Sequence, residues 1–432
     1  MDYTISKFTL TEPLPDGNIG VFNTLTRALG VLPADFWEEA RSGGLDRDGD
    51  AADLIEPGFL VGAEVDEELV LAHWRASQSY DVTHLTYFIN PTLNCNMACS
   101  YCVHGRKTRN SHMDRRTARQ VLDFIQKDIE TKNPLTARID FGGAEASLRP
   151  DLVLYLSEGA CRFCRGKGIG FKTTLISNGL ALKPEFIREM ADLGLFRLRV
   201  TVSGPADIHD KYRTAKNGGG TYERIMASLG ELAGVVGISL QGQYDPASDE
   251  FRRFPELLDD LTRRGLRDYI EEVNFGPINP PQADQVREGA WSSPLECLSD
   301  EDSERIMWLR KRILASGYKQ TLRPPANRCL INYRNSMVIG VDGQISVCPA
   351  MMDFPELDYG RVWDGVDFRK EARYLARKLP EKCRRDCAMA PLCDGGCRHQ
   401  ALIKTGSIDN VNCPGPSFLA LAKAYIREAS AS

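Results

Sequence analysis

The sequence contains no long hydrophobic run and no strong excess of charge of one sign. No apolar stretch approaches the roughly 20 residues that a membrane-spanning helix needs. Residues 1–7 lack the charged and apolar regions of a secretory signal peptide. The net charge of −5 over 432 residues gives no reason to expect nucleic-acid binding. We therefore expect a cytoplasmic protein that binds neither membrane nor nucleic acid.

Cysteine, by contrast, is plentiful, with 13 residues in the chain. Disulfide bonds are rare in the reducing cytoplasm, and metal ligation requires short spacings between ligands. Three of the cysteines fall between residues 95 and 102 and seven between residues 329 and 413. This clustering predicts metal binding. Cys161 and Cys164, spaced i and i+3 in an expected helix, are instead interpreted as small core residues.

The first cluster is the C-x3-C-x2-C motif of Cys95, Cys99 and Cys102. It directly follows residues 85–90, an apolar run typical of a β-strand. Three thiolates leave one iron of a four-iron cluster open, whereas a structural cluster normally has four cysteine ligands. The motif therefore predicts a 4Fe–4S cluster that binds a further ligand. A zinc site or three unrelated buried cysteines is the alternative.

Beyond residue 85, short β-rich runs alternate with helical patterns. The expected strands are residues 85–90, 137–141, 172–176, 198–203, 236–243 and 269–275. The expected helices are residues 114–129, 150–164, 183–193, 221–233 and 249–264. Six strand–helix units in succession predict parallel strands with helices outside. Because a closed barrel has eight such units, we expect an α/β fold with an open, partial (β/α)6 barrel.

The remaining segments suggest a division into four parts. We expect a small N-terminal α+β domain at residues 1–84, the barrel at 85–278, a connector and helix at 279–320, and a loop-rich cysteine domain at 321–432. Within the first part, residues 3–10 and 20–23 are typical of strands, and residues 36–41 and 66–79 of helices. An amphipathic helix is expected at residues 418–429.

The three-cysteine motif after the first strand resembles that of the radical S-adenosylmethionine (SAM) enzymes. The resemblance extends over most of the chain and implies a partial barrel, a 4Fe–4S cluster and SAM as cofactor. It implies that SAM binds the open iron and that Tyr101 packs near the adenine. Packing against the barrel alone is the other interpretation of Tyr101. The family chemistry is reductive cleavage of SAM, followed by abstraction of a hydrogen atom from the substrate.

Two turns resemble further SAM-binding motifs of this family. Gly143, Ala144 and Glu145 take the places of Gly-Gly-Glu, where a backbone edge and the glutamate hold an ammonium group; Ala146 replaces the usual proline. The segment Ser177-Asn178-Gly179 is similar to the Thr-Asn-Gly turn of the family. The resemblance therefore implies that both turns contact SAM.

Residues 201–213 resemble the family's Ser-x-Asp-Gly-Pro…His-Asp…Arg segment. Thr201 takes the position of the serine that contacts the methionine or the ribose, and Arg213 that of the arginine. Ser203 replaces the aspartate, so any role of that carboxylate is lost or moved. His209 is interpreted as a structural hydrogen-bonding residue. No residue is singled out as the catalytic acid or base.

The C-terminal cysteines resemble those of the SPASM domain, which carries two auxiliary 4Fe–4S clusters. The family's ligation implies an outer cluster on Cys383, Cys387, Cys393 and Cys413, and an inner cluster on Cys329, Cys348 and Cys397. Three residues separate Cys383 from Cys387, where the family has two. The fourth inner position is open to a substrate thiolate or is filled by Cys297. Zinc knuckles are the rival interpretation.

SPASM enzymes act mostly on peptides and proteins. The resemblance therefore implies an oxidoreductase-type maturase that installs a thioether or carbon–carbon crosslink, or an epimerised residue, in a ribosomally made precursor peptide. A flavodoxin or ferredoxin would donate electrons. Residues 1–84 would bind the leader of the precursor by strand addition, or would only cover the barrel.

Three other functions stay open. One is a protein oxidase similar to sulfatase maturases, which carry an aspartate where this chain has Pro349. Another is a small-molecule dehydrogenase or sugar-modifying enzyme. The third is a non-enzymatic metal-binding scaffold for a peptide. Which bond is formed does not follow from the sequence.

Overall fold

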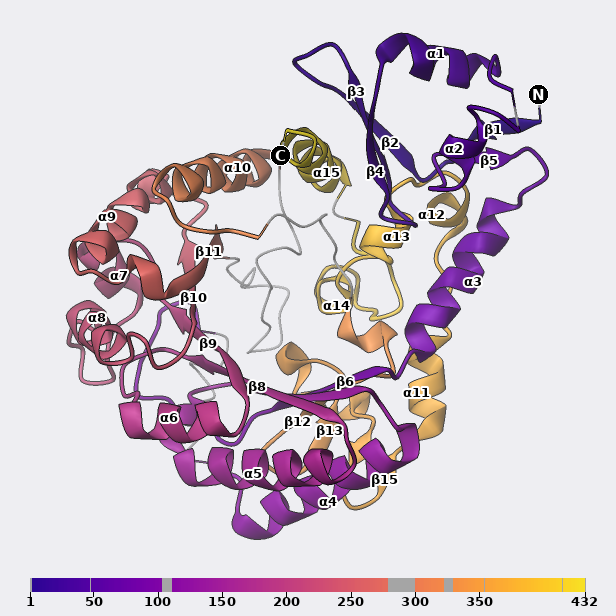
Figure 1. Ribbon diagram of the computed structural model, residues 1–432. Coiled ribbons are helices and arrows are strands. Elements are labelled where there is room, and N and C mark those ends of the chain that lie inside the picture. The colour runs from indigo at the N-terminus through magenta and orange to yellow at the C-terminus, as the bar shows by residue number, and fades with distance from the viewer. Residues whose placement is uncertain are drawn as a thin grey trace.

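The computed structural model describes residues 2–46, 48–102, 111–278, 300–321, 329–352, 354–413 and 415–431. Cys297, the candidate inner ligand, and most of the expected connector lie outside the described residues. Figure 1 shows a curved sheet with helices around its outer face. The C-terminal elements lie at the open side of the curve, and the N-terminal elements lie next to them.

Six parallel strands form the curved sheet, and each pairs with the next in chain order. They are β6 (His84–Ile89), β7 (Thr136–Phe141), β8 (Gly170–Ser177), β9 (Leu195–Thr201), β10 (Ile238–Tyr244) and β11 (Ile270–Pro277). Parallel neighbours require crossover connections, and helices provide them here. The predicted open barrel of six parallel strands is therefore confirmed.

The helices of this region are α4 (Arg115–Lys132), α5 (Pro150–Gly166), α6 (Pro184–Asp192), α7 (Ala206–Tyr212), α8 (Tyr222–Glu231), α9 (Pro255–Arg263) and α10 (Asp300–Ala315), with 3-10 turns η1 (Ala146–Leu148), η2 (Asp249–Arg253) and η3 (Arg267–Tyr269). Proline begins α5, α6 and α9, at a position where the missing N–H is not needed. The single helix expected at 249–264 is wrong, because the chain restarts at Pro255 after η2. Helix α7 was not expected.

Alternating burial explains how the sheet packs against its helices. In β7, Ala137, Ile139 and Phe141 are buried, whereas the residues between them are partly exposed. Cys161 and Cys164 of α5 are 3% and 0% exposed, so the interpretation of this pair as core residues is confirmed. Burial raises the pKa of the Cys164 thiol to about 11, which keeps it protonated.

The C-terminal region extends the barrel sheet. Strand β12 (Ser336–Ile339) pairs in parallel with β6, and β13 (Gln344–Ser346), β14 (Gly360–Arg361) and β15 (Gly365–Val366) follow in antiparallel order. The other elements are η4 (Leu330–Asn332), η5 (Pro349–Met351), η6 (Pro355–Leu357), α11 (Phe368–Leu375), α12 (Glu381–Arg385), α13 (Ala390–Cys393), α14 (Arg398–Thr405) and α15 (Gly415–Ala429). The cysteine-rich segment is thus joined to the barrel by backbone pairing.

The N-terminal residues form two small antiparallel sheets. Strands β1 (Tyr3–Ile5) and β5 (Leu60–Gly62) pair, and β2 (Thr9–Pro13), β3 (Ile19–Asn23) and β4 (Leu29–Leu32) form a three-stranded sheet with β3 in the centre. Helices α1 (Ala34–Ser42), α2 (Ala52–Ile55) and α3 (Glu67–Tyr80) accompany them. The single strand expected at 3–10 is wrong, because a turn with a Thr9 N–H to Ser6 carbonyl hydrogen bond separates β1 from β2.

These N-terminal elements pack against the cysteine-rich segment (Figure 1). Phe8 and Leu71 share a buried cluster with Leu379 and Ala390, and partly buried Cys383 and Cys387 border it. The cluster lies beside α12 and α13. Among the described residues, no helix combines the length and the apolar character that crossing a membrane requires.

Candidate functional site

The three-cysteine loop begins directly after β6, at the carboxyl ends of the parallel strands. Cys95, Cys99 and Cys102 are each partly buried. The turns after β7, β8, β9 and β10 reach the same rim, because parallel strands end on one side of a sheet. The strand order therefore gathers the predicted cofactor contacts around the cysteines.

A second segment, residues 212–216, runs along the cysteine loop, and we call it the strap. The Ala98 N–H donates to the Thr214 carbonyl at 2.8 Å, and the Ser100 N–H donates to the Tyr212 carbonyl at 2.9 Å. In the other direction, the backbone N–H of Lys216 donates to the Asn96 carbonyl at 3.2 Å. These bonds fix the path of the loop. The sequence analysis singled out Arg213, but it did not predict that residues 214–216 run along the cysteine loop.

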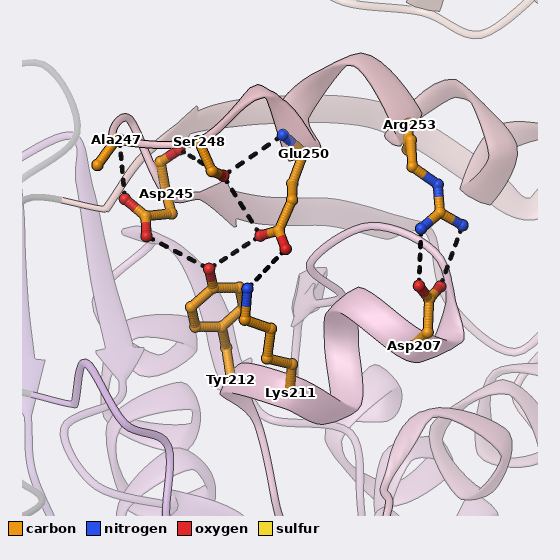
Figure 2. A network of polar contacts seen from close by, with 8 residues as sticks. All are labelled: Asp207, Lys211, Tyr212, Asp245, Ala247, Ser248, Glu250 and Arg253. Carbon is orange, nitrogen blue, oxygen red and sulfur yellow. Dashed lines mark hydrogen bonds and ion pairs between the residues drawn. The ribbon is translucent and has the colours of Figure 1, made fainter.

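The start of the strap is anchored by the polar network of Figure 2. The Tyr212 hydroxyl donates to Glu250 at 2.8 Å and to Asp245 at 3.3 Å. Lys211 forms an ion pair with Glu250 at 2.6 Å. The strap is thereby tied to the loop after β10, so one network links the cysteine loop to that end of the barrel.

The Cys95 sulfur accepts two N–H groups. The backbone N–H of Met97 approaches it at 3.4 Å and the Asn178 side-chain amide at 3.5 Å. Burial raises the pKa of the Cys95 thiol, as do Glu145 and Cys99, whereas the two N–H donors lower it. Donors to sulfur stabilise a thiolate, the form that binds iron.

Glu145 lies at the centre of the rim and is fully buried. One carboxylate oxygen accepts from the Ser147 hydroxyl at 2.6 Å and from the Ser177 hydroxyl at 2.9 Å. The other oxygen accepts from the Asn178 backbone N–H at 2.7 Å. Burial raises the pKa of the Glu145 carboxyl, although these hydrogen bonds oppose the rise. Glu145 thus joins the turns after β7 and β8, and its predicted ammonium contact stays a prediction.

The turn before Glu145 depends on a glycine. Gly143 has φ +97°, and a side chain there would collide with the Asn90 amide at the end of β6. With its amide oriented to donate, Asn90 binds the carbonyl oxygens of Thr92 and Gly142. Asn90 therefore positions the backbone edge that includes partly buried Ala144, a role that its sequence neighbours did not reveal.

Tyr101 and Arg213 are brought together across the rim. The Arg213 guanidinium donates to the Tyr101 hydroxyl at 2.9 Å, and that hydroxyl donates to the Gln243 side-chain oxygen at 3.1 Å. Burial lowers the pKa of Arg213, but Tyr101 and the nearby Cys99 and Cys102 thiols outweigh burial and raise it. A permanently charged arginine thus lies beside the cysteine loop. Gln243, from the end of β10, was missed by the sequence analysis.

His209 lies in a fully buried hydrogen-bond chain. Its Nδ1 accepts the Ser203 backbone N–H at 3.1 Å, so the neutral ring carries its proton on Nε2, which faces the Thr221 hydroxyl at 3.1 Å. The Thr221 hydroxyl donates to the Arg213 carbonyl at 2.6 Å. His209 thus connects the turn after β9 to Thr221 and Arg213, which is the role of a structural hydrogen-bonding residue. Thr201 ends β9 and pairs with Gln241, and its contact with SAM stays a prediction.

These observations fit the expected group. Three cysteines, N–H donors to one sulfur and a buried arginine beside the other two provide soft anionic ligands with compensating positive charge. The structure therefore places six of the eight predicted SAM contacts in loops and turns at one rim, Tyr101, Gly143, Ala144, Glu145, Asn178 and Arg213, while Ser177 is the last residue of β8 at that rim. The eighth, Thr201, is the last residue of the strand that ends there.

The four predicted outer ligands lie close together in the C-terminal segment. Burial, together with the neighbouring Cys413, Cys387 and Cys383, raises the pKa of the Cys393 thiol to about 12. The loop after Cys393 passes close to Asn412, the residue before Cys413. Only a glycine allows this approach, since a side chain at Gly396 (φ +72°) would collide with the Asn412 carbonyl. The chain is thus folded so that distant cysteines meet.

The three predicted inner ligands each precede a helical turn. Cys329 stands before η4, Cys348 before η5 and Cys397 before α14. Among the described residues, no three cysteine, histidine or acidic side chains lie close enough to hold a single metal ion. The ligands of a four-iron cluster surround a group of iron and sulfide atoms and lie farther apart. Cluster ligation at the inner and outer cysteines stays a prediction.

Comparison with known proteins identifies the class. Residues 89–238 match the Radical SAM superfamily. Over 339 residues the chain is 25% identical to the PqqA peptide cyclase of Ruegeria pomeroyi, which covers 73% of this chain and 82% of the cyclase. It is 27% identical over 139 residues to the AdoMet-dependent heme synthase of Methanosarcina barkeri, but this match spans only 36% of the synthase and 32% of this chain.

Solved structures show the same fold. Native anSMEcpe with bound AdoMet aligns with a TM-score of 0.59 at 15% identity, covering 80% of this chain and 98% of that one. SuiB of Streptococcus suis bound to S-adenosylmethionine aligns with a TM-score of 0.55 at 14% identity, covering 95% of this chain and 99% of that one. The chain therefore contains a radical SAM domain with the partial-barrel fold, as its cysteine motif predicted. Such a domain implies a 4Fe–4S cluster and SAM as cofactors.

Proposed function

We propose that this protein is a radical SAM enzyme that modifies a peptide, and that its C-terminal region is a SPASM-type domain with two auxiliary clusters. The observation that carries the proposal is the cysteine loop held at the barrel rim beside Glu145, Asn178 and Arg213. A metal-binding scaffold has no need of these buried polar contacts around a three-ligand site. They therefore favour an enzyme.

We assign different residues of the rim to the cluster and to SAM. Cys95, Cys99 and Cys102 hold the first 4Fe–4S cluster, and the Asn178 amide stabilises the Cys95 thiolate. A reduced cluster held there would supply the reductive cleavage of SAM and the hydrogen-atom abstraction from the substrate that follows it. The Glu145 carboxylate would hold the ammonium group of bound SAM. The surrounding barrel excludes water and other hydrogen donors.

The names of the related proteins favour a peptide as the substrate. One relative is a PqqA peptide cyclase, and SuiB has been solved bound to its precursor peptide SuiA. A structure of native anSMEcpe likewise contains AdoMet and the Cp18Cys peptide. By this analogy, the chain installs a thioether or carbon–carbon crosslink, or an epimerised residue, in a ribosomally made precursor peptide. A flavodoxin or ferredoxin supplies the electrons.

The leader of that precursor is proposed to add a strand to the N-terminal sheet. In the order β2-β3-β4, the described part of the chain provides no partner for the outer edge of β4. The other edge strand, β2, packs on α15 instead. Unpaired N–H and C=O groups of an edge strand are a ready template for an extended peptide. Val31 in β4 is 43% exposed and offers an apolar contact.

A pair of substitutions tests this surface. Val31→Arg replaces the exposed apolar contact on β4, and Val65→Arg makes the same change at a valine that is 40% exposed outside the sheet. The probe is a fluorescently labelled candidate precursor peptide, and binding is measured by fluorescence anisotropy. We expect Val31→Arg to weaken binding about tenfold, equivalent to about 1.4 kcal/mol. Equal binding by both variants and the unsubstituted protein would contradict the assignment.

A further inference from the structure

Two arginines of the C-terminal segment are buried without full compensation. Arg377, just after α11, is 7% exposed, and Arg398, the first residue of α14, is 0% exposed. A buried charge is stable only when it is paired and hydrogen-bonded. The surroundings of these two guanidiniums therefore indicate what they bind.

Protein groups satisfy only one nitrogen of each guanidinium. One terminal nitrogen of Arg398 donates to the Tyr374 carbonyl at 2.9 Å. One terminal nitrogen of Arg377 donates to the Asn410 carbonyl at 2.8 Å and to the Gly395 carbonyl at 3.3 Å. Within the described structure, the Nε and the other terminal nitrogen of each arginine are buried without a hydrogen-bond partner. Four donor atoms thus lack an acceptor.

The nearby carboxylates do not supply these acceptors. Asp394 is buried and forms an ion pair with Arg75 at 2.6 Å, while also accepting from the Asn332 amide at 2.7 Å. Asp409 pairs at the surface with Arg373 at 2.9 Å. Positive charge is therefore in excess around Arg377 and Arg398.

The cysteines lie where an anion would balance that charge. The Cys329 thiol is close enough to both guanidiniums to interact with them electrostatically. Arg377 is also close to Cys383 of the outer group. Arg398 directly follows Cys397 in the chain. Arg377 therefore lies between the predicted inner and outer ligands, and Arg398 lies on the inner side.

We propose that Arg377 and Arg398 are the cationic partners of an anionic iron–sulfur cluster on Cys329, Cys348 and Cys397, and that they raise its reduction potential. The inference rests on the proposed SPASM-type function and adds positioning residues to it. A cluster bound by thiolates carries net negative charge, and reduction adds another. Adjacent positive charge and N–H donors to sulfur stabilise the reduced form. The two arginines thus make the inner cluster easier to reduce than it would be without them.

The test compares midpoint potentials in the full chain after anaerobic reconstitution. Arg398→Gln and Arg377→Gln remove one charge each, whereas Arg398→Lys keeps the charge with a different donor geometry. Arg373→Gln removes a surface arginine that is 60% exposed and serves as the matched control. Iron per chain is measured beside a redox titration followed by electron paramagnetic resonance. The readout therefore does not depend on enzyme activity.

We expect one cluster signal to shift to a more negative potential in both Gln variants, less in Arg398→Lys, and not in the control. Loss of one cluster from Arg398→Gln but not from Arg398→Lys also supports a requirement for charge. Unchanged potentials in fully iron-loaded Gln variants would overturn the inference, as would equal cluster loss from Arg398→Gln and Arg398→Lys. Unsubstituted protein with iron for only the first cluster would instead overturn the proposed function, and the inference with it.

Discussion

Glu145 illustrates how a single carboxylate organises the candidate site. Its oxygens accept hydrogen bonds from Ser147, Ser177 and Asn178, and Asn178 in turn donates to the Cys95 sulfur. The carboxylate thus controls the turn that supports the cysteine loop. Its charge is also the feature that a bound ammonium group requires.

Replacing Glu145 with Gln tests both roles. An amide NH2 in place of one oxygen faces N–H or O–H donors, so a buried donor loses its acceptor at a cost of about 1–3 kcal/mol. We expect a lower thermal midpoint and weaker equilibrium binding of SAM to the reconstituted protein. Glu185→Gln, at a side chain that is 75% exposed, is the control. Unchanged SAM affinity in Glu145→Gln would argue against the ammonium contact.

His209 makes the barrel sensitive to acid. Burial, and then the Arg213 charge, lower the pKa of His209 from its usual 6.5 to about 2. Below pH 6.5 the unfolded chain binds a proton that the folded chain does not, so folding stability falls as the pH falls. The slope from this group is roughly 1.4 kcal/mol per pH unit.

His209→Asn should remove that slope. Asparagine keeps an acceptor for the Ser203 N–H but does not titrate. We expect the difference in unfolding free energy between the unsubstituted protein and the variant to shrink steadily from pH 7 to pH 5, measured by urea denaturation. Exposed His84→Asn should show no such trend. A difference that does not vary with pH would contradict the assignment of a neutral, buried ring.

At the residue scale, the sequence indicated the kind of role a residue has more readily than it indicated which residues contact one another. The motif around Cys95 and the core role of Cys164 followed from local spacing, because ligand number and helix periodicity are local properties. Gln243 and Asn90 could not be predicted. Each acts through a partner that only the strand order brings near, such as Tyr101 for Gln243.

At the element scale, the strap at residues 212–216 is the support of the cysteine loop. It runs beside the loop through backbone hydrogen bonds, and an isolated bridge joins Met97 to Ala215. Lys216 contributes twice, because its ammonium also donates to the Asn94 side chain at 2.8 Å. The strap therefore limits the conformations of the loop before any cluster binds.

Comparing Lys216→Pro with Lys216→Ala distinguishes the effect of the backbone hydrogen bond to Asn96 from that of the side-chain hydrogen bond to Asn94. Proline removes the N–H that Asn96 accepts, whereas alanine removes only the ammonium. We expect Lys216→Pro to lose the first cluster, about four irons per chain, and Lys216→Ala to keep it. Iron analysis after anaerobic reconstitution checks this. Full iron content in the proline variant would show that the loop holds its shape without the strap.

The sequence predicted helices and strands where the hydrophobic pattern is clear and the segment is long enough to show it. The six barrel strands were found because each lies between turn residues and a helical pattern. By contrast, β12 pairs with β6 although about 250 residues separate them, and no local pattern encodes such a partner. Helix α7 was missed because its seven residues are too short for a clear period.

For the whole molecule, the N-terminal elements and the cysteine-rich segment form one packed body. Lys7 donates to the Arg384 carbonyl at 2.8 Å, and Arg75 pairs with Asp394 at 2.6 Å. Phe22 also packs edge-on against Tyr425 of α15 at 5.2 Å. Removing residues 1–80 would expose this apolar surface beside the outer cysteines. Point substitutions therefore test leader binding more cleanly than truncation does.

Iron content tests the predicted distribution of clusters. Three 4Fe–4S clusters amount to about twelve irons per chain. Replacing Cys387 and Cys393 with Ala should remove about four of them while leaving the first cluster in place. Cys161→Ala, at a core cysteine, should remove none. Zinc in place of iron at the C-terminal cysteines would contradict the two auxiliary clusters.

The most direct test of the central claim is cleavage of SAM by the reconstituted protein. With a strong reductant, we expect 5′-deoxyadenosine and methionine to form in equal amounts, and Cys99→Ala to form neither. Both products are measured by liquid chromatography and mass spectrometry. If the unsubstituted protein holds its first cluster and still leaves SAM intact under every strong reductant tried, the assignment of the barrel rim as a radical SAM site is wrong.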